Sequence, residues 1–351
     1  MDIPKVRLGR TELYVTKTSF GALPVQRIGH EAARKLLRRA YESGINYFDT
    51  ANMYTDSEEK IGEALHDVRH HIVISTKSGG KDKKTVREHI ELSLRRMQTD
   101  YIDLFQFHNP AELPDPEDPD GPYAAALEAK EKGYIRHIGI TNHRLGVAQA
   151  AIASGNFETL QFPFCYLCTE KDLQLLRACE AADMGFIAMK GLSGGMLSNA
   201  AACYAFMQQH PNVVPIWGIQ HEWELDQWLK LTEENQQMTP ELAAVIDVRS
   251  SYFDELAAVL GKETIDTYNT GESRGRETSH SLNYQKLGKE LMSQDELAVM
   301  DGGKCILQLR GVRPFLSDKY DITKHPNFKY TADADDKNAF DIEAFLSARL
   351  K

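Results

Sequence analysis

Residues 45–77 read INYFDTANMYTDSEEKIGEALHDVRHHIVISTK and contain one complete strand–helix–strand unit. The stretch Asn46–Thr50 is short and largely apolar, which predicts a buried strand. Ser57–Asp67 has apolar residues at helical spacing, which predicts an amphipathic helix, and His71–Thr76 returns to the strand pattern. A strand, a helix and a second strand in this order form the usual connection between neighbouring parallel strands.

The same alternation continues on both sides of this unit. Ser19–Leu23 predicts a strand before it and Ala32–Ser43 a helix. The strands predicted after it are Ile102–Phe107, His137–Thr141, Thr159–Pro163, Gly185–Met189 and Val213–Gly218. The other predicted helices are Lys84–Met97, Pro122–Lys132, Leu145–Ser154, Glu170–Ala182, Ala200–Gln209 and Glu222–Leu231. Eight strands, each followed by a helix, predict an α/β fold of the (β/α)8 TIM barrel class over residues 1–247. A doubly wound open sheet is the alternative, but no G-x-G-x-x-G turn follows the first strand.

The two ends of the chain differ from the barrel pattern. Val6–Val15 predicts a β-hairpin that turns at Gly9-Arg10 and closes the N-terminal end of the barrel. Residues 248–351 are more polar, which predicts a separate and partly disordered C-terminal extension. The elements predicted within this extension are a linker or loop over Lys262–Glu290, a helix over Gln294–Met300 capped by Ser293, a strand over Cys305–Leu309 and a helix over Asn338–Leu350.

The composition limits the possible partners and location. The net charge of −10 argues against non-specific nucleic-acid binding, which needs a basic face. No apolar run approaches the roughly 20 residues that cross a bilayer, so no membrane association is expected. The N-terminus has no apolar signal core, which predicts a cytoplasmic protein. The sequence does not indicate an oligomeric state.

The cysteines do not predict a metal site. Five are scattered along the chain, and Cys165 and Cys168 form one C-x-x-C pair. Such a pair can be redox-active or half of a zinc site, but no second ligand pair follows to complete four zinc ligands. We therefore favour a structural role for these residues, as small buried apolar side chains.

Four ionisable residues fall where consecutive predicted strands end. Asp49 and Tyr54 follow the second strand, Lys77 the third and His108 the fourth, so a parallel barrel brings them to one rim. A lysine beside the phenol lowers the tyrosine pKa from about 10, and a carboxylate keeps that lysine charged. The residues therefore predict Tyr54 as a general acid, Lys77 as its activator, Asp49 as the partner of Lys77, and His108 as the group that orients a substrate carbonyl. Alone, each has an ordinary structural explanation; together on one rim, they favour carbonyl reduction.

Five segments carry a family resemblance: FDTANMYTDSEEKIGEAL, VISTK, LRRMQTDYIDLFQFH, GYIRHIGITNH and IAMKGLSGGML. In order and spacing they resemble the aldo-keto reductase family over residues 1–247. The resemblance implies a barrel that reduces aldehydes and ketones with NADPH or sometimes NADH, with small carbonyl compounds as substrates. It places a catalytic tetrad on Asp49, Tyr54, Lys77 and His108. It also implies nicotinamide contacts from Thr141, Asn142 and Gln161.

Two departures from the family pattern concern the cofactor. Where the family has a nicotinamide-stacking tyrosine in A-Y-S-P-L, this chain has Ala188-Met189-Lys190-Gly191-Leu192. We expect Met189 to cover the nicotinamide and Lys190 to meet a cofactor phosphate. The loop after the eighth strand, which contains the expected cofactor contact Gly218, lacks the Arg or Lys that would hold a 2′-phosphate. The predicted cofactor is therefore NADP or NAD.

The C-terminal extension resembles a different class of protein. Some relatives with the M-K-x-L-x-G-G pattern continue into a cysteine-rich iron–sulfur segment, but only Cys305 lies in this region, so no cluster is predicted. Residues 251–351 instead resemble the C-terminal end of TraG-type coupling proteins of bacterial conjugation, without an ATP-binding loop. The chain is thus interpreted as a fusion. The alternatives to a reductase are a catalytically impaired cofactor-binding scaffold and an interaction module that acts through the tail.

Overall fold

The computed structural model describes residues 3–260, 262–274, 278–290, 304–307, 315–318, 324, 326 and 328–330. The chain forms two compact units, residues 1–299 and 300–351.

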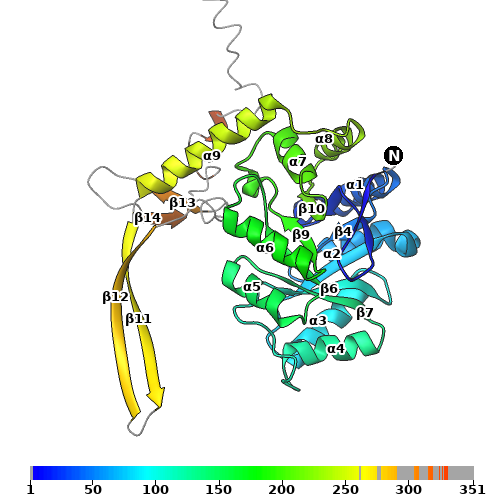
Figure 1. Cartoon of the computed structure of the whole chain (residues 1–351). Coiled ribbons are helices and arrows are strands. Elements are labelled where there is room, and N and C mark those ends of the chain that lie inside the picture. Colours follow the sequence, from blue (N-terminus) through cyan, green and yellow to red (C-terminus); the bar gives the residue numbers. More distant parts are fainter. Residues whose placement is uncertain are drawn as a thin grey trace, which may run out of the picture. The chain divides into compact units, whose positions relative to one another are not determined.

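The first unit contains a closed barrel of eight parallel strands (Figure 1). Around the barrel the strand order is β10-β3-β4-β5-β6-β7-β8-β9. The strands are β3 (Ser19–Gly21), β4 (Tyr47–Asp49), β5 (Val73–Ser78), β6 (Ile102–His108), β7 (Ile135–Thr141), β8 (Thr159–Pro163), β9 (Gly185–Met189) and β10 (Val213–Gly218). The predicted (β/α)8 barrel is confirmed, and the bounds of the last three strands agree with the prediction.

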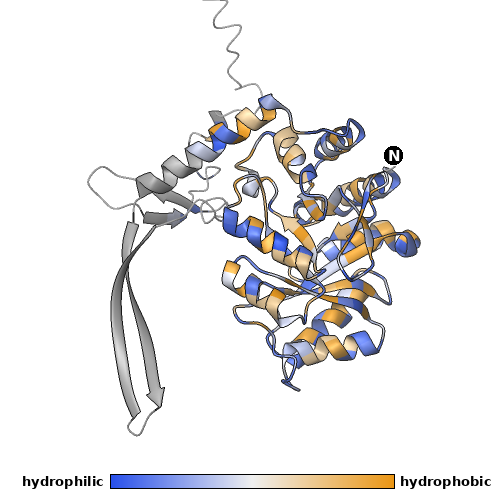
Figure 2. Ribbon diagram, viewed as in Figure 1, coloured by the Kyte–Doolittle hydropathy of each residue, from blue (hydrophilic) through white to orange (hydrophobic). Residues whose placement is uncertain are grey.

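Helices alternate with the barrel strands and cover them from outside. They are α1 (His30–Glu42), α2 (Ser57–Leu65), α3 (Lys83–Arg96), α4 (Pro122–Glu131), α5 (Leu145–Ser154), α6 (Glu170–Ala181), α7 (Ala200–Gln208) and α8 (Glu222–Glu233). Their ribbons alternate between hydrophilic and hydrophobic residues, as amphipathic helices on a core require (Figure 2). A further helix, α9 (Pro240–Leu260), continues across the domain boundary predicted at residue 247.

Local sequence signals explain several helix ends. Asp82 caps α3, since its side chain accepts a hydrogen bond from the Thr85 amide at 2.9 Å. Thr169 and Asp172 form a capping box at the start of α6. Gly155 ends α5 with φ +69°, a left-handed conformation that glycine adopts without a Cβ clash.

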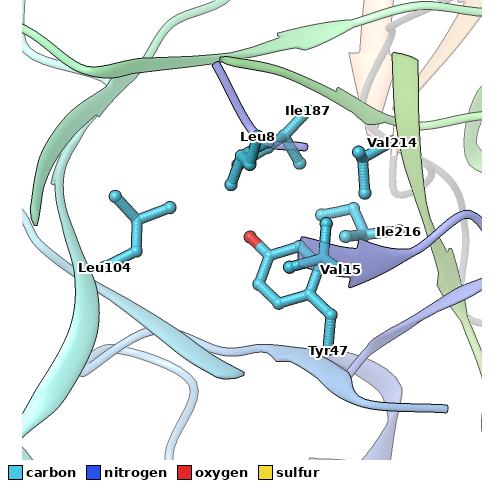
Figure 3. Packing of buried hydrophobic residues seen from close by; sticks show 7 residues of the cluster. All are labelled: Leu8, Val15, Tyr47, Leu104, Ile187, Val214 and Ile216. Carbon is cyan, nitrogen blue, oxygen red and sulfur yellow. The ribbon is translucent and has the colours of Figure 1, made fainter. Parts of the chain in front are cut away.

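The predicted N-terminal hairpin closes one end of the barrel. Strands β1 (Lys5–Arg7) and β2 (Tyr14–Thr16) pair antiparallel, and the chain turns at Gly9 with φ +55°. A Cβ on Gly9 would lie 2.2 Å from the backbone nitrogen of Gly185, so only glycine fits here. Leu8 and Val15 reach into the barrel. Figure 3 shows them packed with Tyr47, Leu104, Ile187, Val214 and Ile216.

The structure of residues 262–274 and 278–290 differs from the prediction. We expected a linker or loop, but β11 (Lys262–Arg274) and β12 (Thr278–Glu290) form an antiparallel hairpin. Its register pairs Ile265 with Leu287 and Tyr268 with Tyr284. Threonine, isoleucine and tyrosine favour strands even in a polar segment. The absence of a long apolar period concealed this signal.

The second unit contains one described strand pair. β13 (Lys304–Leu307) pairs antiparallel with β14 (Phe315–Asp318), which agrees with the strand predicted near Cys305–Leu309. The helices predicted over Gln294–Met300 and Asn338–Leu350 lie outside the described residues. The resemblance of this tail to coupling proteins stays a prediction. Within the described segments no helix is long and apolar enough to cross a membrane.

A buried ion pair fastens the N-terminal ends of β5 and β6. Arg69, in the short 3-10 helix His66–His71, donates a 2.7 Å hydrogen bond to Asp103 Oδ2. The same oxygen accepts the Ile74 amide at 3.0 Å, and Oδ1 accepts Arg136 at 3.0 Å. The guanidinium groups of Arg69 and Arg136 flank the Tyr101 ring, 3.9 and 3.8 Å from its centroid. The side chains of Arg69 and Asp103 are only 5% and 2% exposed, so each needs the other.

We expect Asp103→Ala to lower the free energy of unfolding by about 3–5 kcal/mol, because it leaves the Arg69 charge buried without a partner. Urea unfolding of the full chain measures this change. The control, Glu42→Ala, removes an exposed pair with Arg38 on α1 and should change stability by less than about 0.5 kcal/mol. A loss below about 1 kcal/mol for Asp103→Ala would contradict the expectation.

Candidate active site

The structure brings the four predicted catalytic residues to the C-terminal end of the barrel. Asp49 ends β4, Lys77 lies near the end of β5, and His108 ends β6. Tyr54 lies in the loop between β4 and α2. The parallel register pairs Asp49 on β4 with Ser75 on β5, and Lys77 on β5 with Gln106 on β6. These residues therefore lie close together near the C-terminal ends of three neighbouring strands.

Asp49 and Lys77 form a buried ion pair. Lys77 Nζ donates to Asp49 Oδ2 at 2.6 Å and to the Thr50 carbonyl at 2.5 Å. The side chains of Asp49 and Lys77 are 3% and 1% exposed. Burial lowers the pKa of Lys77, and the Asp49 charge opposes that shift. The pair thus keeps an ammonium group in a site that would otherwise favour the neutral amine.

A second set of hydrogen bonds fixes the Asp49 carboxylate. Ser75 Oγ donates to Asp49 Oδ1 at 2.6 Å, and Ser75 accepts the Tyr47 hydroxyl at 2.9 Å. Gln106 Nε2 lies 3.5 Å from the same Oδ1. Both carboxylate oxygens therefore have donors, as a buried charge requires.

Tyr54 and His108 face each other beside this pair. Their rings meet edge to face, with centroids 5.8 Å apart and an interplanar angle of 81°. Lys77 Nζ lies 5.4 Å from the Tyr54 ring centroid. An ammonium has three N–H groups, and Asp49 and Thr50 account for two of them. The third is available for the phenol.

The pKa of Tyr54 differs from our expectation. We expected Lys77 to lower it, but burial of the ring raises it, and the nearby Asp49 charge raises it further. A phenolate here would be desolvated and close to a carboxylate, and both effects favour the neutral phenol. Tyr54 therefore keeps its proton, which is the form that a general acid needs.

His108 has the opposite shift. Burial, with smaller contributions from Lys77 and His143, lowers its pKa to about 3. The imidazole is therefore neutral near pH 7. Its Nδ1 is buried and has no hydrogen-bond partner among the described residues. A buried polar atom of this kind is suited to a ligand contact, since an unmet hydrogen bond is costly.

A network centred on Glu58 holds the loop that carries Tyr54. Glu58, in the first turn of α2, accepts the Thr76 hydroxyl at 2.6 Å and Arg96 at 3.3 Å. Arg96 also donates to the Asn52 carbonyl at 3.0 Å, two residues before Tyr54. Glu58 is 1% exposed, so this network is part of the barrel core. The sequence analysis did not identify it, because Glu58 resembles an ordinary helix-start residue.

The predicted cofactor residues lie on the adjoining strands of the same rim. Thr141 ends β7 and accepts the Asn109 amide at 3.0 Å. Asn142 donates to the Pro110 carbonyl at 2.9 Å and accepts the Arg144 amide at 2.9 Å. The Asn142 amide thus helps to close its own loop, which the sequence did not suggest.

Gln161, Met189, Lys190 and Gly218 continue this rim. Gln161 on β8 accepts Gln106 Nε2 at 2.8 Å, and its own Nε2 lies 3.9 Å from Met189 Sδ. Lys190 follows β9 in a left-handed conformation with φ +57°. Gly218 ends β10, where a Cβ would lie 3.3 Å from Pro24 Cγ. The structure thus places all six predicted cofactor residues at one end of the barrel.

An indole pair supports the loop after β9. Trp217 and Trp228 stack with ring centroids 3.9 Å apart and an interplanar angle of 12°. A Cβ on Gly191 would lie 2.6 Å from the Trp217 ring, so the glycine lets the loop rest on the indole. Sequence reasoning missed this pair, since two tryptophans eleven residues apart carry no recognisable spacing signal.

A basic group adjoins the same loop. Burial lowers the pKa of His143 to about 4, and the charges of Lys190 and Arg144 contribute to the shift. The cationic side chains of Lys190 and Arg144 thus both lie near His143. The role of Lys190 in meeting a cofactor phosphate stays a prediction.

The C-x-x-C cysteines lie in a buried turn that disfavours their thiolate forms. The Cys168 amide donates to the Cys165 carbonyl at 2.9 Å, which forms a turn after β8. Burial raises the pKa of Cys165 to about 11 and that of Cys168 to about 12. Their thiols stay protonated near neutral pH, which supports the structural interpretation. In the described ranges no cluster of His, Cys, Asp and Glu could hold a metal ion.

Comparisons with known proteins agree with this architecture. A model of the aldo/keto reductase family matches residues 17–256. The uncharacterized oxidoreductase YqkF of Bacillus subtilis is 29% identical over 208 residues, which is 55% of this chain and 66% of that protein. L-galactose dehydrogenase of Arabidopsis thaliana is 30% identical over 212 residues, 54% of this chain and 66% of that protein. The chain thus spans just under two thirds of these relatives.

Solved structures share the fold. The holo form of aldo-keto reductase AKR11C1 from Bacillus halodurans superposes with a TM-score of 0.61 at 23% identity, over 70% of this chain and 95% of that one. An aldo-keto reductase from Klebsiella pneumoniae in complex with NADPH has a TM-score of 0.59 at 22% identity, over 71% and 96%. Because the family model covers more than half of the sequence, including the whole barrel from β3 onward, the chain belongs to the aldo/keto reductase family.

Proposed function

We propose that this protein reduces small aldehydes or ketones with the reduced form of a nicotinamide dinucleotide, NADPH or NADH, so that the cofactor leaves as NADP or NAD. One observation carries the proposal: the buried Asp49–Lys77 pair lies beside the edge-to-face pair of Tyr54 and His108. The four groups form a proton-donating unit, and they stand at the end of the barrel where enzymes of this fold react.

The residues divide the proton chemistry between them. Tyr54 holds the proton and donates it from its phenol oxygen to the carbonyl oxygen of the substrate. Lys77 stabilises the phenolate that remains, and Asp49 keeps Lys77 charged. His108 is neutral and orients the same carbonyl by a hydrogen bond. Because burial raises the pKa of Tyr54, the proton leaves only when the carbonyl oxygen gains negative charge.

The adjoining residues fit a nicotinamide dinucleotide, which supplies the hydride when bound. Thr141, Asn142 and Gln161 offer the donors and acceptors that a carboxamide needs. We expect Met189 to cover the ring and Lys190 to meet a phosphate. Gly218 has no side chain, so we expect the cofactor to come close to the backbone at the end of β10. The buried Nδ1 of His108, which has no partner among the described residues, further supports a ligand site at this end of the barrel.

The loop after β10 bears on the choice between NADP and NAD. The sequence has no Lys or Arg from residue 215 to 229. Glu224 instead accepts the backbone amides of Gln220 and His221 at 2.6 and 2.9 Å. A carboxylate on these amides disfavours a 2′-phosphate at the same place. We therefore expect NADH to serve at least as well as NADPH, although a relative of the same fold is known in complex with NADPH.

We expect Tyr54→Phe to lower kcat by roughly 10²–10⁴-fold, because it removes the proton donor and retains the ring. Cofactor oxidation by the purified chain, with NADPH and NADH against a panel of small aldehydes, measures the effect. The matched control is Tyr14→Phe, at an exposed hairpin tyrosine, which should leave kcat unchanged. Equal turnover by Tyr54→Phe and wild type would refute the proposal. Cofactor binding without turnover in wild type would favour the scaffold alternative.

The pH dependence of kcat offers a separate check. His108 stays neutral above its pKa of about 3, and the pKa of Tyr54 lies above its ordinary value, so both keep their working forms through the neutral range. We expect a flat kcat profile for reduction from about pH 5 to 9. An acidic limb near pH 6.5 that disappears in His108→Asn would show that the imidazole must change charge, contrary to this mechanism.

A further inference from the structure

Gln106 is a fully buried polar residue that the proposed chemistry does not use. It lies on β6, two residues before His108, and is 0% exposed. Its Nε2 donates to Gln161 Oε1 at 2.8 Å and lies 3.5 Å from Asp49 Oδ1. Gln106 thus connects the carboxylate that holds Lys77 with a residue of the cofactor rim.

A glycine makes this connection possible. Gln106 and Gln161 stand on β6 and β8, and β7 runs between them with Gly139 beside Gln106 in the register. A Cβ on Gly139 would lie 3.2 Å from Gln106 Cγ and 2.1 Å from Thr159 Oγ1. Any larger residue on β7 would therefore displace the side chains that meet here. The gap lets one amide reach the other across the intervening strand.

The Asp49 carboxylate determines which way the Gln106 and Gln161 side-chain amides are turned. A carboxylate only accepts hydrogen bonds, so Gln106 must turn its NH2 group, and not its oxygen, toward Asp49. That NH2 group in turn meets the oxygen of Gln161. The Gln161 NH2 group is then left on the other side, near Met189 Sδ at 3.9 Å. The charge on Asp49 thereby determines which end of Gln161 a ligand meets.

We propose that Gln106 is a positioning residue that fixes the Gln161 amide so that its NH2 group meets the oxygen of the cofactor carboxamide. The inference rests on the proposed function, since it assumes that a nicotinamide dinucleotide binds at this rim. Gln106 itself touches neither cofactor nor substrate. It acts by holding one orientation of Gln161 before the cofactor arrives, which spares the cost of ordering that side chain on binding.

The test uses the full chain and four variants: Gln106→Met, Gln161→Met, the double variant, and Thr159→Val. Thr159 is also buried, and its hydroxyl has no partner among the described residues, so Thr159→Val is a matched polar-to-apolar change on the neighbouring strand. Quenching of tryptophan fluorescence gives Kd for NADPH and NADH. Kinetics with a small aldehyde gives kcat and KM, and thermal unfolding reports on the fold.

We expect Gln106→Met to raise the cofactor Kd about three- to tenfold, as the loss of one buried hydrogen bond predicts. Thr159→Val should stay within about twofold of wild type. Because Gln106 acts through Gln161, the double variant should bind no more weakly than Gln161→Met alone. Wild-type affinity in Gln106→Met, or fully additive losses in the double variant, would overturn the inference.

Three further outcomes can be told apart. If Gln106→Met fails to fold, Gln106→Asn keeps a neutral amide but shortens the side chain by one methylene, so that it no longer reaches Gln161; it should weaken cofactor binding, and unchanged binding would overturn the inference. If wild type binds cofactor but reduces no carbonyl, the proposed function fails, while the binding measurements still decide the role of Gln106. If wild type binds neither dinucleotide, both proposals fail.

Discussion

The buried ion pair between Asp49 and Lys77 is the interaction on which the site depends. Removing two charges from water costs several kcal/mol for each, and their attraction offsets that cost only when every remaining donor and acceptor is met. The barrel supplies these partners from Ser75, Thr50 and Gln106. The side chains that surround the pair are therefore constrained by it, including several that touch no ligand.

The same pair acts on its two aromatic neighbours in opposite directions. The Asp49 carboxylate raises the pKa of Tyr54, while the Lys77 ammonium lowers that of His108. Burial adds to both shifts: it raises the pKa of Tyr54 and lowers that of His108, because it favours the neutral form of each ring. One ion pair thus keeps a phenol protonated and an imidazole neutral. Two neutral hydrogen-bonding groups therefore stand together at the C-terminal end of the barrel, and the proposed reaction would use them to stabilise the negative charge that develops on a carbonyl oxygen.

The sequence predicts the barrel and the rim because both follow from periodic patterns. Strand–helix alternation fixes the order of the elements, and parallel strands bring residues such as Asp49 and His108 together without knowledge of distances. Contacts that depend on side chains crossing between strands have no such pattern. Gln106 reaches Gln161 only because Gly139 lacks a side chain, and Trp217 meets Trp228 only through packing. The hairpin of β11 and β12 was missed for another reason, since its strand signal lies in β-branched polar residues.

The two sides of the rim achieve order by different means. The Tyr54 side is held by hydrogen bonds among buried polar groups, such as those of Glu58. On the cofactor side, residues Lys190, Ser193, Gly194 and Gly195 all have positive φ within six positions. Non-glycine residues in this conformation cost of order 1–3 kcal/mol each, so they persist only where packing determines the backbone. Here the Trp217 indole packs against Gly191, and backbone hydrogen bonds within the loop join the Ser193 amide to the Lys190 carbonyl and the Leu197 amide to the Leu192 carbonyl. The loop after β9 is therefore held by its own backbone hydrogen bonds and by the core beneath it, while the loop that carries Tyr54 is held by a buried network of charged side chains.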